Sequence, residues 1–148
     1  MRPIPDFAIA SQKVLTLEGE KPAAILIKGE KILDVVSIEN IPENCPTEDM
    51  RNNVIMPGLV DAHVHINEPG RTDWEGFETA TKSAAAGGIT TLVDMPLNCI
   101  PVTTTIDALN PKIIATIDQP WIDCGFYGGL IPDNIQDLES LADAQLLG

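Results

Sequence analysis

Two histidines and an aspartate alternate with apolar residues in one short stretch of the chain. Asp61, His63 and His65 occupy every second position, with alanine and valine between them. Because alternate side chains of a β-strand share a face, this pattern predicts a strand with one apolar face and one face bearing a carboxylate and two imidazoles. Burying such a polar face is costly unless its groups are satisfied, and two imidazoles at this spacing can converge on one divalent metal ion.

A pair of hydrogen-bonded or solvent-exposed histidines is the alternative, and it is the commoner state of a His-x-His pair. Three features favour a metal site: the chain has only these two histidines, Asp61 extends the polar face, and Pro69-Gly70 makes a loop directly after the strand. In parallel α/β barrels the chemistry lies in the loops after the carboxyl ends of the strands. The spacing by itself leaves both interpretations open.

The elements that must position these residues alternate between strand and helix. In the second part of the chain, strands are expected at residues 58–66, 89–95 and 121–127. Helices are expected from Thr72 to Gly87, from Asn110-Pro111 onward, and at residues 134–147. Before them, three short antiparallel strands are expected at residues 6–17, 23–28 and 31–37, followed by a polar linker at residues 39–53. Repeated strand–helix alternation implies parallel pairing, but periodicity alone does not separate an open sheet from part of a barrel.

Composition limits the classes of partner. The net charge of −13 disfavours nucleic acid and anionic membranes, so a small-molecule substrate is expected. No apolar run is long enough for a signal peptide or a membrane span. Three cysteines without a Cys-x-x-Cys spacing indicate a reducing intracellular compartment. The cytoplasm is the expected location, and an organelle stays open.

Three motifs carry a family resemblance. They are DAHVHINEPGR at residues 61–71, AAGGITT at residues 85–91 and DMPLN at residues 94–98. With them, the stretch from Val54 to Thr105 resembles the amidohydrolase superfamily, and within it the allantoinase branch of the cyclic amidohydrolases. The resemblance implies an α/β fold: the first three βα units of a (β/α)₈ TIM-type barrel at residues 54–148, preceded by a small β-sandwich-type segment and linker at residues 1–53.

The same resemblance implies a metal-dependent hydrolase of cyclic amides. In the family, the His-x-His pair binds one metal of a two-metal centre, a carboxylated lysine bridges the metals, two later histidines complete the site, and a late aspartate is the general base. His63 and His65 carry over as ligands, and Asp61 is expected to orient the strand or a ligand. Zinc is the expected metal, with iron, cobalt, nickel or manganese as alternatives. The bridging lysine and the general base are expected beyond Gly148, so the chain is expected to be truncated and inactive alone.

Substrate choice is expected to depend on two asparagines. Dihydroorotases have an arginine that holds a substrate carboxylate at the position of Asn67, so an uncharged hydantoin ring suits this chain better. Asn98 is a second expected substrate contact. The implied reaction is therefore the opening of allantoin to allantoate. Alternatives are a hydantoinase, dihydropyrimidinase or dihydroorotase relative, and a non-catalytic truncated product that binds full-length subunits; a homo-oligomer is open for the complete protein.

Overall fold

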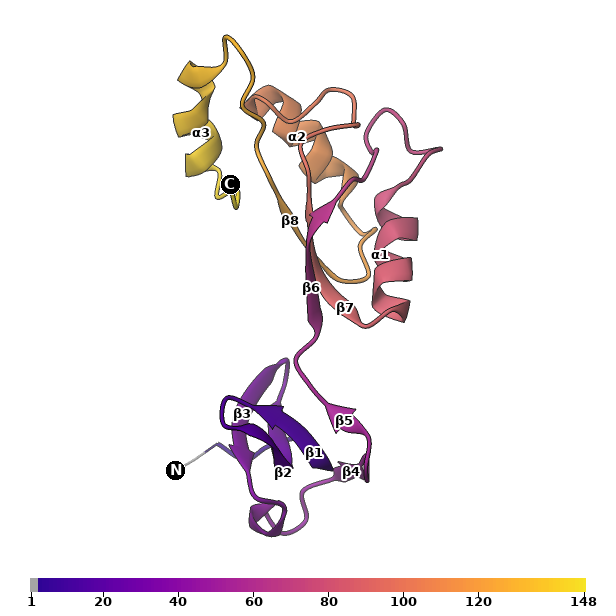
Figure 1. Ribbon diagram of the computed structural model, residues 1–148, viewed down its shortest axis with the longest axis vertical. Helices are drawn as coiled ribbons and strands as arrows, with labels where there is room; N and C mark the ends of the chain where they lie inside the picture. Colours follow the sequence, from indigo (N-terminus) through magenta and orange to yellow (C-terminus); the bar gives the residue numbers. More distant parts are fainter. Residues whose placement is uncertain (1–2) are drawn as a thin grey trace. The chain divides into compact units, whose positions relative to one another are not determined.

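The computed structural model describes residues 3–148, which divide after Pro57 into two compact units (Figure 1). The sequence had placed this boundary after Asn53. The difference arises because Val54 and Ile55 form strand β5, which pairs with the first strand of the chain. Among the described residues, none of the helices is long and apolar enough to span a membrane.

The first unit is a small β-sheet. Strands β1 (Phe7–Thr16), β2 (Gly19–Lys28) and β3 (Lys31–Val36) pair antiparallel, while β4 (Thr47–Asp49) and β5 (Val54–Ile55) pair parallel to β1. A 3-10 turn, η1, spans Ile38–Asn40. The apolar side chains of alternate positions on β1, including Ala8 and Ala10, are buried, as the period of a half-buried strand requires.

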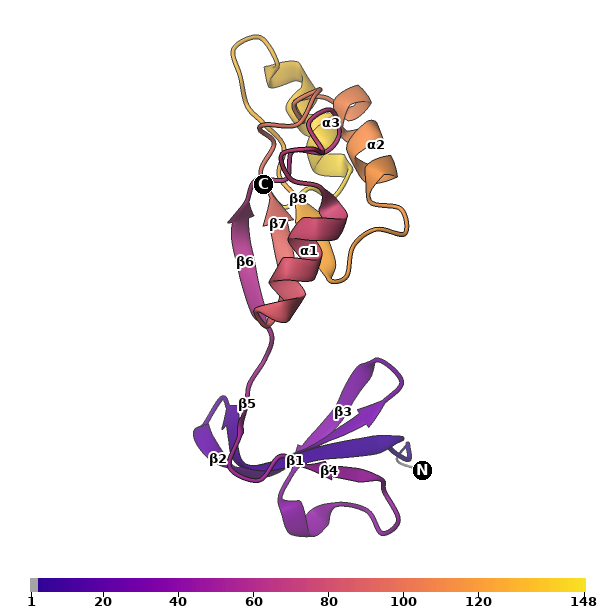
Figure 2. The same ribbon diagram turned by 90° about the vertical axis from the view of Figure 1, so that its right-hand side faces the viewer.

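The second unit has three parallel strands in the order β6-β7-β8. They are β6 (Leu59–Val64), β7 (Ile89–Asp94) and β8 (Asp123–Phe126). Helix α1 (Phe77–Ala86) connects the first two strands, and α2 (Ile106–Ala115) connects the last two. The chain then forms a 3-10 turn, η2 (Ile135–Asp137), and helix α3 (Leu138–Asp143). Figure 2 shows α1 lying along one face of this sheet.

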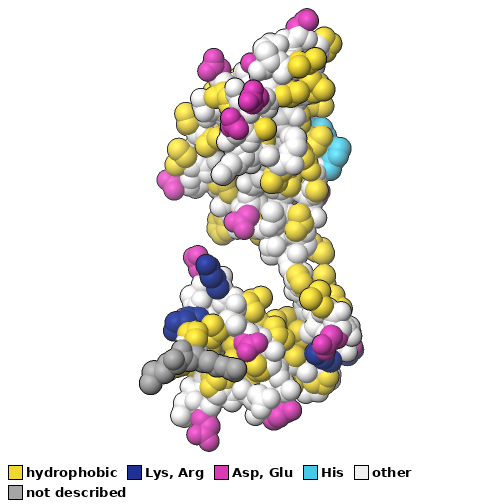
Figure 3. Space-filling view, turned by 90° about the vertical axis from the view of Figure 1, so that its left-hand side faces the viewer, with side chains coloured by type: hydrophobic (Ala, Val, Ile, Leu, Met, Phe, Trp, Pro, Cys, Tyr) yellow, Lys and Arg dark blue, Asp and Glu magenta, His cyan; other side chains and the backbone are white. Residues whose placement is uncertain are grey.

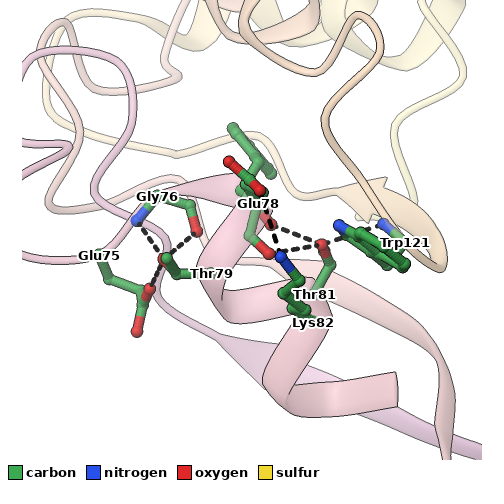
Figure 4. Close-up of polar contacts among 8 residues, drawn as sticks. Glu75, Gly76, Glu78, Thr79, Thr81, Lys82 and Trp121 are labelled. Atoms are coloured by element: carbon green, nitrogen blue, oxygen red, sulfur yellow. Dashed lines mark hydrogen bonds and ion pairs between the residues drawn. The ribbon is translucent and has the colours of Figure 1, made fainter. Parts of the chain in front are cut away.

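The core of the second unit joins α1 to the sheet. Ile66, Phe77 and Leu92 are fully buried and contact one another. Thr81 adds a polar tie on the inner side of α1: its hydroxyl donates to the carbonyl of Phe77 (2.6 Å) and accepts from the backbone N–H of Trp121 (3.1 Å; Figure 4). This tie secures the segment that leads into β8.

Helix boundaries are where the structure departs from the sequence prediction. Helix α1 begins at Phe77 rather than Thr72, because the carboxylate of Glu68, nine residues upstream, accepts the N–H of Phe77 (2.9 Å). An acidic group at a helix N-terminus is stabilising, and here it comes from the preceding loop, while the Thr79 hydroxyl accepts the N–H of Gly76 locally (3.3 Å; Figure 4).

The other two helices also differ from the prediction. Helix α2 begins after Thr105, whose side chain accepts the N–H of Ala108 (3.2 Å), so Pro111 lies inside the helix instead of opening it. The third predicted helix is shorter than expected and is preceded by the 3-10 turn.

Candidate metal centre

The two histidines lie at the carboxyl end of β6. His63 is within the strand and exposed, and His65 directly follows the strand and is half-buried. The pairing of β6 with β7 is irregular between Asp61 and Val64. There, the Asp61 carboxylate accepts the backbone N–H of His63 (3.1 Å). Asp61 therefore acts on the strand backbone that presents the first imidazole.

The imidazole rings face each other through the same ring nitrogen. Nε2 of His63 and Nε2 of His65 are 3.3 Å apart, with ring centroids at 5.2 Å and planes inclined by 55°. Two nitrogens bound tetrahedrally to zinc at the usual bond length are separated by about 3.3–3.4 Å. The pair therefore fits two ligands of one metal ion. The same separation also allows an N–H···N hydrogen bond between a donating and an accepting imidazole, the alternative that the sequence left open.

Asn98 lies against the far side of the His65 ring. Its amide nitrogen Nδ2 is 3.4 Å from Nδ1 of His65, and its backbone adopts a left-handed conformation (φ 73°) that asparagine tolerates better than most residues. In this orientation Nδ2 would donate to Nδ1; with the amide turned so that its oxygen faces Nδ1–H, Asn98 would instead hold His65 in the tautomer whose Nε2 lone pair is free for a metal. The loop after β7 thus meets the end of β6, as expected for parallel strands.

Asn67 is placed differently from Asn98. It is only 9% exposed, and its backbone is engaged: its N–H donates to the carbonyl of Glu75 (3.1 Å), and its carbonyl accepts the N–H of Arg71 (3.0 Å). The structure brings Asn98 to the histidine pair, whereas Asn67 lies mostly beneath the surface.

The loops after β6 and β7 are tied to each other. The guanidinium of Arg71 donates to the carbonyl of Asn98 (3.4 Å), and the N–H of Ile100 donates to the carbonyl of Pro69 (2.8 Å). Gly70 has φ 92°, and a Cβ added there would lie 2.7 Å from the Ile100 side chain. A glycine is therefore required at this close approach of the two loops.

A buried ion pair lies directly behind the histidines, and the sequence analysis missed it. Asp94, the last residue of β7, accepts the N–H of Ile66 (2.7 Å) with one carboxylate oxygen and contacts the ammonium of Lys112 with the other. Asp94 and Lys112 are each 1% exposed. Burial raises the pKa of Asp94, while the Lys112 ammonium and the Ile66 N–H act in the opposite direction. The sequence could have indicated this pair, because Lys112 lies three residues after Leu109 and therefore on the same, inward face of α2.

A hollow of about 520 Å³ opens beside His63. Its walls come from β6, from the loop after β7 and from the segment after β8, and are mainly apolar, as in many small-molecule sites. Figure 3 shows histidine at the surface of this unit with hydrophobic side chains around it. Within residues 3–148, no third His, Cys, Asp or Glu joins the histidines to form a cluster of three.

Residues 54–129 match the model of the amidohydrolase family. The chain belongs to the amidohydrolase family. It is 50% identical over 144 residues to an allantoinase of Streptomyces avermitilis, covering 97% of this chain and 32% of that protein. It is 45% identical over 155 residues to an allantoinase of Saccharomyces cerevisiae, covering 98% of this chain and 34% of that protein. The family resemblance expected from the sequence is confirmed.

A solved hydantoinase structure shares the fold. An L-hydantoinase (dihydropyrimidinase) from Arthrobacter aurescens superimposes with a TM-score of 0.81 at 32% identity, covering 93% of this chain and 31% of the hydantoinase. The α/β fold therefore resembles the N-terminal part of these hydrolases. The chain spans about a third of the length of the curated relatives it matches.

Proposed function

We propose that His63 and His65 hold one divalent metal ion of a cyclic amidohydrolase, and that this hydrolase is an allantoinase, which opens the hydantoin ring of allantoin to allantoate. The observation that carries the proposal is the 3.3 Å separation of the two Nε2 atoms at the carboxyl end of a parallel strand. The identities of 50% and 45% to proteins named allantoinase support allantoin over the substrates of hydantoinases, dihydropyrimidinases and dihydroorotases. Zinc fits the imidazole pair, and iron, cobalt, nickel and manganese also accept imidazole ligands.

The chain's own residues would prepare this site in three ways. Asp61 holds the His63 backbone, and Asn98, with its amide oxygen turned toward Nδ1–H, would set the tautomer of His65. The apolar hollow beside His63 is of a size to receive a five-membered ring. A metal held by these histidines would supply a Lewis acid able to polarise the ring amide and activate water. Asn67 would affect substrate choice because it stands where dihydroorotases have an arginine. Without that guanidinium, the loop would not bind the carboxylate of a substrate such as dihydroorotate.

The remaining architecture of the proposed enzyme follows from the family. The second unit would supply the first three βα units of a (β/α)₈ barrel, and the first unit would form part of a small β-sandwich. The general base and the further metal ligands would come from residues that this chain does not contain. The free cysteines favour a reducing compartment such as the cytoplasm. Self-association of the complete enzyme is compatible with this arrangement.

A hydantoinase or dihydropyrimidinase activity is the second candidate, because the solved structure at TM-score 0.81 carries those names. Such an enzyme would also open a cyclic amide. The lower identity, 32% against 50%, makes it the weaker candidate.

A chimera separates these activities. Residues 1–148 would replace the matching segment of the Streptomyces avermitilis allantoinase, and the purified protein would be assayed with allantoin, a 5-substituted hydantoin, dihydrouracil and dihydroorotate. We expect allantoin to be opened, and His63→Ala in the same chimera to abolish turnover. A folded, metal-loaded chimera that opens dihydrouracil but leaves allantoin intact would refute the allantoinase assignment.

A further inference from the structure

The Asp94–Lys112 pair joins the carboxyl end of β7 to helix α2. Both side chains are almost completely buried. A buried ion pair can often be replaced by apolar residues of similar volume with no loss of stability, so stability alone does not account for it. Its position relative to the histidines suggests a different use.

The carboxylate of Asp94 reaches the backbone immediately after the second histidine. One oxygen accepts the N–H of Ile66, which belongs to the peptide bond formed by the carbonyl of His65. A shift of that peptide moves the Cα of His65 and therefore its ring. The backbone just before His65 is also fixed to the end of β7, because the N–H of Met95 donates to the carbonyl of Val64 (2.7 Å).

Lys112 fixes the carboxylate in turn. Its ammonium comes from α2, eighteen residues after Asp94, and contacts the oxygen that does not bind Ile66. With both oxygens engaged, the carboxylate cannot rotate without losing a charge-assisted hydrogen bond. The orientation of the Ile66 N–H is thereby set by α2 as well as by the sheet.

We propose that Asp94, held by Lys112, is a positioning residue for the metal site: it fixes the peptide after His65 so that the two Nε2 atoms stay at ligand separation. This inference rests on the proposed metal site at His63 and His65. If the ion pair served only folding, replacing it in a chain that still folds would leave metal affinity unchanged.

Zinc affinity of the full chain tests the proposal, measured by competition with a chromophoric chelator. Asp94→Leu/Lys112→Met keeps the volume but removes the acceptor for Ile66, and we expect zinc to bind about tenfold more weakly. Asp94→Asn/Lys112→Gln keeps the acceptor, and we expect an affinity within about threefold of the parent. Asp94→Glu keeps the charge but displaces the acceptor, and we also expect weaker binding.

Two controls separate the possible failures. Thr81→Val removes a buried side-chain hydrogen bond at the other end of the sheet, and should leave zinc affinity unchanged. His63→Ala/His65→Ala should abolish binding; if it does not, the metal site itself is refuted. If that double variant loses zinc while the folded Asp94→Leu/Lys112→Met and Asp94→Glu chains bind it like the parent, the positioning role alone is overturned. Asp94→Glu keeps the question decidable should the apolar pair fail to fold.

Discussion

Removing the ammonium of Lys112 should destabilise the second unit far more than removing an exposed lysine. In Lys112→Met the side-chain volume is nearly preserved, but the carboxylate of Asp94 stays buried at 1% exposure with no cation beside it. Breaking a buried pair by removing one partner costs about 3–5 kcal/mol, because an uncompensated charge remains inside the protein.

That cost translates into a large change in the unfolding midpoint. The second unit has about 90 residues, and a unit of this size has an m-value of about 1–1.5 kcal/mol per molar urea. The midpoint is therefore expected to fall by about 2–5 M. The loss should be larger at about pH 8 than at about pH 5: burial raises the pKa of Asp94, and a carboxyl with a raised pKa destabilises the fold as rising pH ionises it.

Tryptophan fluorescence isolates the relevant unit, because Trp74 and Trp121 are the only tryptophans and both lie in it. Lys82→Met is the matched control: Lys82 pairs with Glu78 on the surface, where both side chains are more than half exposed, so its loss should cost at most about 1 kcal/mol. If Lys112→Met unfolds at the same urea concentration as this control, the carboxylate of Asp94 is not a buried charge, and the reasoning fails.

Three further predictions concern the loops and a cysteine. Gly70→Ala should lower the melting temperature measured by circular dichroism, since its left-handed backbone and the contact with Ile100 leave no room for a Cβ, and an unchanged melting temperature would contradict the close approach. Asn67→Arg should lower both the stability of the chimera and its allantoin turnover, because a guanidinium would have to enter a position that is 9% exposed; unchanged kcat/KM and melting temperature would count against it. Burial raises the pKa of the Cys124 thiol to about 11, and the nearby carboxylates add to the shift. Alkylation of Cys124, mapped by mass spectrometry, should therefore be slow at pH 8 and rise steeply above about pH 10. Fast labelling at pH 8 would contradict this.

The strands were predictable from the sequence because each carries its own periodic signal. The alternation at residues 61–65 identified β6 and the shared face of the histidines, and in the structure the loop after the parallel strand β7 brings Asn98 to His65. These inferences depend only on the alternation of side chains along a strand and on the rule that parallel strands end at the same edge of a sheet.

The helix ends and the ion pair were not predictable because they depend on contacts between distant residues. The N-terminus of α1 is set by Glu68 from the preceding loop, and Lys112 finds its partner on β7. A local pattern does not report which carboxylate will fold back onto a helix end. The inner face of α2 carries Lys112 beside Leu109, whereas Ile113 is exposed.

The most direct test of the metal site is nitrogen NMR of the imidazoles during a zinc titration. The full chain contains only His63 and His65, so every imidazole signal belongs to the proposed pair. The account predicts that zinc shifts the Nε2 resonances of both residues together, at one ion per chain, while Nδ1 of each stays protonated. Nε2 signals that stay in place would show that the 3.3 Å pair is a hydrogen-bonded couple and not a metal site, and coordination through Nδ1 would contradict the proposed ligand atoms.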